Sequence, residues 1–273
     1  LASLLADPYN ILGIEYLKAL RRLNSSMVPY TILRKGSHYH DSSINGRFSS
    51  ASAIRSLLAY SSSSLRTDRS GGSFDDTPFS NILGVLEEQV PACCLELLKD
   101  CHKVLFPVYQ NDFSLILKYK LLNKQPEDLT RYLDVSGELA NRICSQLNNF
   151  FNYKQFCELL KTREITHARI SRALLHIMLG IKTKNVQEYI DGGWHFYARL
   201  LGFRKDRVKL LSLLSEKSSL PVLTRLSESA VLPAPGRQML RNDLLASNLY
   251  NSVVTDKFKT AFQNEYKQAV IKI

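Results

Sequence analysis

Apolar residues recur at helical spacing through most of the chain from Ile82 onward, and this pattern limits the possible folds more than any other. The segments follow one another with short connections, which is typical of packed antiparallel helices. Helices are predicted over residues 82–98, 113–122, 126–133, 138–151, 153–160, 166–180, 206–214, 236–250 and 257–270. The chain from residue 76 to residue 273 is therefore expected to be one mostly helical domain.

The first part of the chain has a different pattern. A helix is predicted over residues 7–24, a short strand over the β-branched and aromatic residues 28–33, and a second helix over residues 51–58. Helices that alternate with strands are typical of an α/β fold. The serine-rich segment 61–73 has little apolar content, so it predicts an exposed linker and a domain boundary near residue 75. Residues 194–200 and 220–224 are predicted to add a small β element to the helical part.

Composition excludes several classes of protein. The 273 residues are 45% apolar and include five cysteines without a C-x-x-C pair, so neither disorder nor a disulfide framework is expected. The cysteines are predicted to be buried, reduced thiols, which fits a cytoplasmic location. The longest apolar run, residues 174–181, is much shorter than the roughly 18 residues that span a bilayer, so no membrane partner is expected. Because the chain begins at Leu1 rather than at methionine, we expect an N-terminal part to be missing.

The positive charge is unevenly placed. The chain carries 36 Lys and Arg against 25 Asp and Glu, and residues 161–210 alone hold eleven basic and four acidic residues. On the predicted helix 166–180, Arg169, Arg172 and His176 share one face, opposite the expected core face. Such a face is suited to binding the phosphate backbone of a nucleic acid. The alternative interpretation is an ordinary helix face that is charged because it is exposed to solvent. The same segment has further cations that favour a nucleic-acid partner, namely Arg163, Arg199, Arg204, Lys205, Arg207 and Lys209.

Two other patterns are weaker. Residues 128–143 resemble a helix-turn-helix, in which Asn141 and Arg142 would read base edges. Three-helix units of this shape are common in helical domains, so DNA is not expected as a partner. The loop with His38, His40 and Asp41 contains possible metal ligands, but three ligands in so short a loop rarely reach one ion. We expect no metal there and interpret the loop as a polar segment near a phosphate site.

Residues 48–55, F-S-S-A-S-A-I-R, place small hydroxyl residues directly before a predicted helix and an arginine one turn into it. Unpaired backbone amides and the helix dipole favour anions at such a position, and Arg55 adds a permanent charge. The segment is thus predicted to bind phosphate. It also resembles the second signature of the nucleotidyltransferase superfamily, I-S-S-T-x-I-R. Ser50, Ser52, Ile54 and Arg55 match that signature, whereas Ser49 and Ala51 depart from it.

Three segments resemble the tRNA(Met) cytidine acetate ligase family in order and spacing. They are P-Y-N-I-L-G-I-E-Y-L-K-A-L at residues 8–20, R-K-G-S-H-Y-H-D at residues 34–41, and the loop at residues 48–55. Residues 134–143 and 166–180 are similar to the family's helical domain, so the resemblance covers nearly the whole chain. It implies an α/β Rossmann-like nucleotidyltransferase remnant over residues 1–75 and a mostly α-helical tRNA-binding domain with a small β element over residues 76–273.

The resemblance also implies a function. Enzymes of that family use ATP, here expected with magnesium, to convert acetate to acetyl-adenylate, and pass the acetyl group to N4 of the wobble cytidine in elongator tRNA(Met). By position, ATP would contact Asn10, Arg34, Lys35, Ser50, Ser52 and Arg55. The cations expected to contact tRNA are Arg163, Arg169, Arg172, Arg204, Lys205 and Arg207. No catalytic residue is identified.

One departure concerns the first superfamily signature, H-x-G-H, which occurs nowhere in these residues. Its imidazoles normally stabilise the α-phosphate, so we expect the chain to be a fragment that does not make acetyl-adenylate by itself. One alternative is a non-catalytic RNA-binding module with a vestigial nucleotide site. Another is an adenylyltransferase for a small cofactor precursor, which would leave the helical, basic part without a role.

Overall fold

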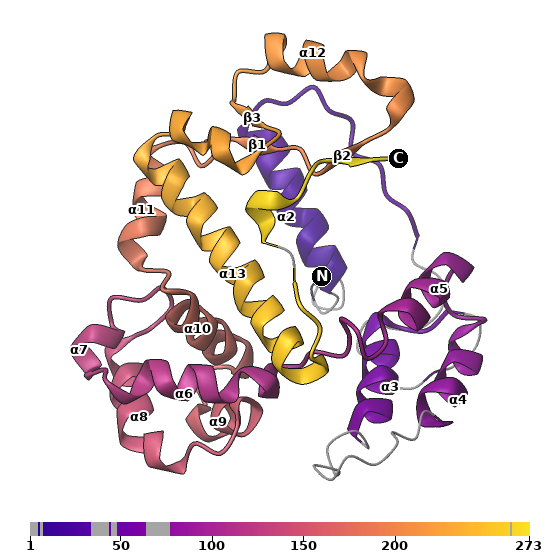
Figure 1. Cartoon of the computed structure of the whole chain (residues 1–273). Helices are drawn as coiled ribbons and strands as arrows, with labels where there is room; N and C mark the ends of the chain where they lie inside the picture. Colours follow the sequence, from indigo (N-terminus) through magenta and orange to yellow (C-terminus); the bar gives the residue numbers. More distant parts are fainter. Residues whose placement is uncertain (1–4, 6–7, 34–43, 45–47, 64–76, 263) are drawn as a thin grey trace. The chain divides into compact units, whose positions relative to one another are not determined.

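The computed structural model describes residues 5, 8–33, 44, 48–63, 77–262 and 264–273. The chain divides into two compact units, Leu1–His102 and Lys103–Ile273, and each has an apolar core of its own. Figure 1 shows the helices and strands in chain order. Within the described ranges, no helix combines the length and the apolar character needed to cross a membrane.

The described residues of the first unit are mainly helical. Ile82 and Leu86 are buried together with Leu95, and Ile54 and Leu57 pack against them from a third helix. These residues come from α3, α4 and α5, so the three helices share one small core. The helices of the unit are α2 (Pro8–Arg22), α3 (Ala51–Ser63), α4 (Thr77–Leu86) and α5 (Ala92–Cys101).

Two predictions for the first unit are wrong. Residues 28–33 are exposed and form no strand, because the unit offers them no strand partner among its described residues. The single helix predicted over residues 82–98 is two helices, since α4 ends at Leu86 and α5 starts only after Pro91. A proline has no amide hydrogen to donate, and it is tolerated at a helix start but not in the interior.

The first unit extends to His102, beyond the boundary predicted near residue 75. It does so because α4 and α5 pack on α3. The predicted linker is partly helical, since α3 continues to Ser63, and the rest of it from residue 64 lies outside the described residues. The assignment of a nucleotide-binding remnant and a tRNA-binding domain to the two parts of the chain stays a prediction.

In the second unit, five helices surround a large apolar core. Phe150, Phe156, Leu174 and Ile177 are among its fully buried side chains. The rings of Phe150 and Phe156 stack with their centroids 4.4 Å apart. The five helices are α6 (Ser114–Leu122), α7 (Pro126–Leu129), α8 (Gly137–Gln146), α9 (Tyr153–Leu160) and α10 (His167–Leu179). This helical arrangement confirms the prediction, although α7 and α8 are shorter than expected.

Side chains set the starts of three of these helices. Ser136, Asn152 and Thr166 precede α8, α9 and α10, and each accepts a hydrogen bond from the amide three residues further on. Such caps satisfy amides that the helix leaves unpaired. Helix α10 ends at Gly180, whose φ of 74° lies in the left-handed region that favours glycine.

The rest of the second unit combines short strands with three more helices. Strand β1 (Ala198–Arg199) pairs in parallel with β3 (Val222–Leu223), and β2 (Gly202–Phe203) pairs in parallel with β4 (Ile271–Lys272). The predicted small β element is therefore present, with shorter strands than expected. The helices are α11 (Thr183–Asp191), α12 (Lys209–Lys217) and α13 (Ala234–Phe258). Short 3-10 helices are η2 (Gln110–Phe113), η3 (Leu147–Asn149), η4 (Lys205–Arg207), η5 (Leu226–Val231) and η6 (Glu265–Lys267).

The end of the chain differs from the prediction. The helix expected over residues 236–250 runs on to Phe258, and Lys259 closes it in the left-handed conformation. A residue with positive φ cannot continue a right-handed helix. Residues 257–270 therefore do not form one α-helix. Their described part comprises the last turn of α13 and a connection with η6 that leads to β4.

The last turn of α13 is fastened to the beginning of the second unit. Lys257 Nζ lies 2.8 Å from Asp112 Oδ2, and it also lies 5.5 Å from the centroid of the Tyr109 ring. Tyr250 donates a hydrogen bond from its hydroxyl to the carbonyl oxygen of Leu105 at 3.3 Å. These contacts join segments of the chain that are 145 residues apart.

The five cysteines are all free thiols, but their burial differs from the prediction. Cys157 is buried in the core, Cys93 is exposed, and Cys94, Cys101 and Cys144 are partly buried. Burial raises the pKa of the Cys157 thiol to about 11. The expectation of buried thiols therefore holds for Cys157 only.

Candidate functional site

The segment predicted to bind phosphate, residues 48–55, forms the start of α3. Ser50 is 1% exposed, and its Oγ accepts a hydrogen bond from the amide of Ala53 at 3.0 Å. Its carbonyl oxygen accepts from the amide of Ile54 at 3.1 Å. The amides of Ala51 and Ser52 donate to no acceptor among the described residues. Within that part of the chain, these two amides are available to an anion at the positive end of the helix.

Arg55 is exposed and bends back toward the same helix end. Its Nη2 donates a hydrogen bond to Ser52 Oγ at 3.3 Å, so the guanidinium lies over the first turn of α3. A permanent positive charge therefore stands where the helix dipole also favours a negative ligand. The structure brings Ser50, Ser52 and Arg55 together in one short segment, and their role as ATP contacts stays a prediction.

Ser49 is a candidate that the sequence analysis missed. Its amide donates to Gln89 Oε1 at 3.0 Å, which ties the segment to the connection between α4 and α5. Its Oγ is buried and has no hydrogen-bond partner in the described part of the chain. A buried hydroxyl without a partner is costly, which makes Ser49 a candidate ligand-binding residue. In the sequence, position 49 is a serine where the superfamily signature has isoleucine. This extra hydroxyl is the signal that could have identified Ser49 as a candidate.

Of the remaining predicted ATP contacts, Asn10 alone lies within the described residues. Asn10 lies exposed in the first turn of α2, and no hydrogen bond among the described residues joins it to residues 48–55. Arg34, Lys35 and the histidine loop at residues 38–41 lie outside the described residues. No cluster of metal-ligating side chains is present in the ranges that the structure describes.

The predicted cationic face of α10 is partly neutralised. Arg172 Nε lies 2.8 Å from Asp134 Oδ2, and His176 Nδ1 lies 3.5 Å from the same carboxylate oxygen. His176 Nδ1 also lies 3.1 Å from the carbonyl oxygen of Leu133. Arg169 is exposed on the first turn of the helix and has no ion-pair partner among the described residues. The sequence pattern placed these residues on one face but could not show that an acidic residue from another segment reaches it.

The other predicted tRNA contacts lie in two places. Arg163 is exposed in the connection between α9 and α10. Arg204 directly precedes η4 and Arg207 is its last residue, and their Nε atoms are 3.0 Å and 3.4 Å from carboxylate oxygens of Asp206. Lys205 is exposed between them. Figure 1 shows α12, which follows η4, well separated from α10 within this unit, so the predicted cations form two groups rather than one surface.

The possible DNA-reading arginine is used inside the protein. Arg142 donates from Nε to the carbonyl oxygen of Leu160 at 3.0 Å and from Nη2 to that of Leu159 at 2.8 Å. Its guanidinium thus satisfies the last carbonyls of α9 instead of facing a base. The helix-turn-helix interpretation therefore loses one of its two candidate contacts.

Comparison with known proteins places the chain in a family. Residues 1–266 match the family described as HIGH Nucleotidyl Transferase. The chain belongs to this family. The chain is 33% identical over 250 residues to a tRNA(Met) cytidine acetate ligase from Acetivibrio thermocellus, and the alignment covers 91% of this chain and 56% of that protein. A protein of the same name from Alkaliphilus metalliredigens is 30% identical over 249 residues, covering 91% and 54%. The chain spans about half the length of these curated relatives.

Solved structures agree on the fold of this chain. Thermotoga maritima TmcAL in an apo form has a TM-score of 0.78 at 23% identity, covering 98% of this chain and 61% of that one. The same protein bound with alpha-thio ATP has a TM-score of 0.75 at 21% identity, covering 98% and 60%. The likeness confirms the expected nucleotidyltransferase-type fold.

Proposed function

We propose that this chain is part of an ATP-dependent tRNA cytidine acetate ligase, which forms N4-acetylcytidine at the wobble position of elongator tRNA(Met). The observation that carries the proposal is the 33% identity to the Acetivibrio thermocellus ligase across 91% of this chain. The start of α3, with its capped helix end and its arginine, supplies a place for the phosphates of ATP.

The proposed reaction has two steps. An oxygen of acetate attacks the α-phosphorus of ATP, and pyrophosphate leaves to give acetyl-adenylate. The N4 amine of cytidine then attacks the acetyl carbonyl carbon, loses a proton and releases AMP. The first step needs stabilisation of the charge on the departing phosphates, which backbone amides at a helix end and an arginine provide. The second step depends mainly on holding the amine next to a reactive acyl group.

In this proposal, Ser50 fixes the start of α3 while the amides of Ala51 and Ser52 bind the β and γ phosphates. Arg55 neutralises the same phosphates from the side of the helix. The sequence predicts Ser50, Ser52 and Arg55 as phosphate contacts, with unpaired backbone amides at the helix start as the anion-binding groups. Because the Ser50 hydroxyl already accepts from the amide of Ala53, the amides of Ala51 and Ser52 are the proposed ligands. Asn10, Arg34 and Lys35 remain proposed contacts of the nucleotide.

The tRNA would be held by the two groups of exposed cations in the second unit. One contains Arg163 and Arg169 near the start of α10, and the other contains Arg204, Lys205 and Arg207 at η4. Because such contacts release counterions from the RNA, the affinity should fall steeply as salt rises. Arg172 would contribute less, since Asp134 already neutralises it.

The nucleotide part is tested by ATP binding. Arg55→Ala is expected to weaken ATP binding about tenfold or more, because it removes a charged hydrogen bond to phosphate. Arg21→Ala removes the same charge from an exposed position on α2 and serves as the matched control. Equal affinities of the two variants would refute the phosphate site.

The catalytic part is tested by pyrophosphate release. Because H-x-G-H does not occur in the 273 residues, we expect the chain alone to bind ATP and tRNA without releasing pyrophosphate in the presence of acetate. Acetate-dependent release by this chain would overturn the assignment of that step to residues outside it.

A non-catalytic RNA-binding module with a vestigial nucleotide site is the second candidate, and the exposed cations at α10 and η4 favour it as much as they favour the ligase. The gene separates the two. An in-frame upstream segment that encodes H-x-G-H supports the ligase, and a start codon directly before Leu1 supports the module.

A further inference from the structure

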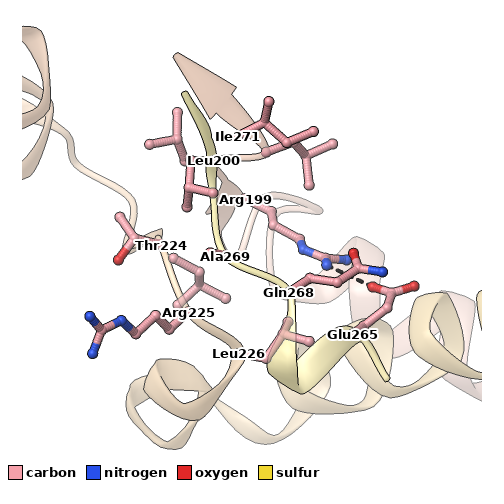
Figure 2. A pocket seen from close by; sticks show the side chains of 12 residues that line it. Arg199, Leu200, Thr224, Arg225, Leu226, Glu265, Gln268, Ala269 and Ile271 are labelled. Atoms are coloured by element: carbon pink, nitrogen blue, oxygen red, sulfur yellow. Dashed lines mark hydrogen bonds and ion pairs between the residues drawn. The ribbon is translucent and has the colours of Figure 1, made fainter. Parts of the chain in front are cut away.

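The second unit contains a cavity of about 230 Å³ between β1, β3 and the segment that leads to the C-terminus. Figure 2 shows that its lining is divided. Leu200, Ala269 and Ile271 form an apolar part, while Arg199 and Glu265 lie together in a polar part. Each part combines a residue from 199–200 with residues from 265–271, and these two segments are far apart in sequence, so the cavity is a product of the fold.

The polar part has unused hydrogen-bonding capacity. Arg199 Nη2 lies 2.6 Å from Glu265 Oε2, and the two side chains are only 26% and 10% exposed. Among the described residues, this is the one hydrogen bond that either side chain makes. A guanidinium has five N–H donors and a carboxylate accepts at both oxygens. The pair therefore leaves donors and an acceptor side by side at the cavity.

An apolar slot beside an adjacent donor and acceptor matches the chemistry of a nucleobase. The flat faces of a base pack on apolar or planar side chains, and its edge carries donors and acceptors next to each other. Sites for drug-sized ligands are about 300–1,000 Å³, so this smaller cavity fits one base better than a whole cofactor. Arg225 also lines the cavity and is exposed, which adds a cation for the phosphate of the same nucleotide.

We infer that this cavity binds one unstacked nucleotide of an RNA, with Arg199 and Glu265 at the edge of the base and Arg225 at the phosphate. The inference rests on the proposed function only in taking RNA as the partner. It assigns a recognition site to the second unit that is separate from the start of α3, where ATP is proposed to bind.

Methyl NMR on the whole 273-residue chain tests the inference. CMP, UMP, AMP, GMP and inorganic phosphate are added separately while the methyl signals of Leu200 and Ile271 are followed. At least one mononucleotide is expected to shift these signals saturably, and phosphate alone is not. Absence of a shift with all four mononucleotides, or the same shifts with phosphate alone, would overturn the inference.

Two variants sharpen the test. Ala269→Leu fills the cavity without changing charge and should weaken nucleotide binding at least tenfold, whereas Ala261→Leu makes the same change outside the cavity and should not. Glu265→Gln preserves the shape but converts an acceptor oxygen to an amide donor, so the order of preference among the four mononucleotides should change. An unchanged affinity for Ala269→Leu, or an unchanged preference for Glu265→Gln, contradicts the inference.

Titration of the same proteins with tRNA separates this inference from the proposed function. If the unmodified chain binds tRNA with a clear salt dependence but no mononucleotide reaches the cavity, the nucleotide site alone is refuted. If the chain does not bind tRNA at any salt concentration, the proposed RNA partner fails, and with it the basis for an RNA nucleotide in the cavity.

Discussion

Replacing Asp134 by asparagine is expected to strengthen tRNA binding. In the folded protein, Asp134 Oδ2 lies 2.8 Å from Arg172 Nε, so a phosphate must displace this carboxylate before Arg172 can bind it. The φ of Asp134 is 66°, a left-handed conformation that asparagine adopts about as readily as aspartate. Asp134→Asn therefore removes the charge while the backbone keeps its conformation.

The size of the effect follows from the exposure of the pair. The side chain of Arg172 is 58% exposed and that of Asp134 is 27% exposed. The pair is therefore treated as a surface ion pair, which contributes about 0.2–1 kcal/mol to stability. Removing that competition should raise tRNA affinity about 1.4- to 5-fold. The salt dependence should also steepen. Exchanging one ion pair for another releases no net counterion, whereas a released Arg172 adds about 0.7–0.9 to the slope of log affinity against log salt.

Fluorescence anisotropy with labelled tRNA between about 50 and 200 mM salt measures both quantities, since this range exposes phosphate contacts clearly. Glu164→Gln is the matched control, because it removes one negative charge from an exposed side chain that has no ion-pair partner among the described residues. If both variants raise the affinity equally and leave the slope unchanged, Arg172 does not become an additional phosphate contact, and the reasoning is refuted.

Three further predictions concern stability and reactivity. Ser50→Ala removes the cap on the Ala53 amide and should cost about 1 kcal/mol, seen as roughly fivefold faster hydrogen exchange at the start of α3; unchanged exchange would contradict the cap. Glu228 accepts backbone hydrogen bonds from Thr224 and Arg225, and these lower its pKa below the ordinary 4.5. Its stabilising effect is therefore present above pH 4.5 and lost as the pH falls through the lower folded value. Denaturation curves of Glu228→Gln and the unmodified protein should differ most at neutral pH and converge in acid, and a constant difference would disprove the assignment. Cys157, with its pKa of about 11, should be the slowest of the five thiols to react with iodoacetamide at pH 8, and labelling as fast as that of exposed Cys93 would show that the core opens.

Local sequence signals predicted the parts of the fold that local chemistry determines. Helix α9 has the bounds expected from the sequence, Tyr153–Leu160, because Asn152 caps its start and its apolar residues all face one core. The break at Pro91 was missed although a proline is a local signal, since the apolar spacing continues across it. The sequence pattern predicts the wrong end for α13, because Lys259 adopts a left-handed conformation that its residue type does not predict.

The strand predicted over residues 28–33 shows a different kind of error. A β-branched and aromatic segment forms a strand only where another strand pairs with it, and a sequence pattern does not supply that partner. In the candidate site too, the sequence predicts contacts within one segment but not contacts between distant segments. The spacing of Ser50, Ser52 and Arg55 was enough to place them together, because all three belong to one helix start. The pairing of Arg172 with Asp134 joins residues 38 positions apart and required the tertiary structure.

The attachment of α13 to the start of the second unit has a consequence for how this unit folds during synthesis. The core residues between Leu117 and Met178 belong to consecutive helices, so they can pack as soon as that stretch has left the ribosome. Lys257 must also emerge before it can pair with Asp112, and each such closure has to wait for the intervening chain. A nascent chain stalled after α10 should therefore already resist a protease across the helical core, while the segment around Leu105, whose carbonyl oxygen accepts from Tyr250, stays open to cleavage until α13 has been made.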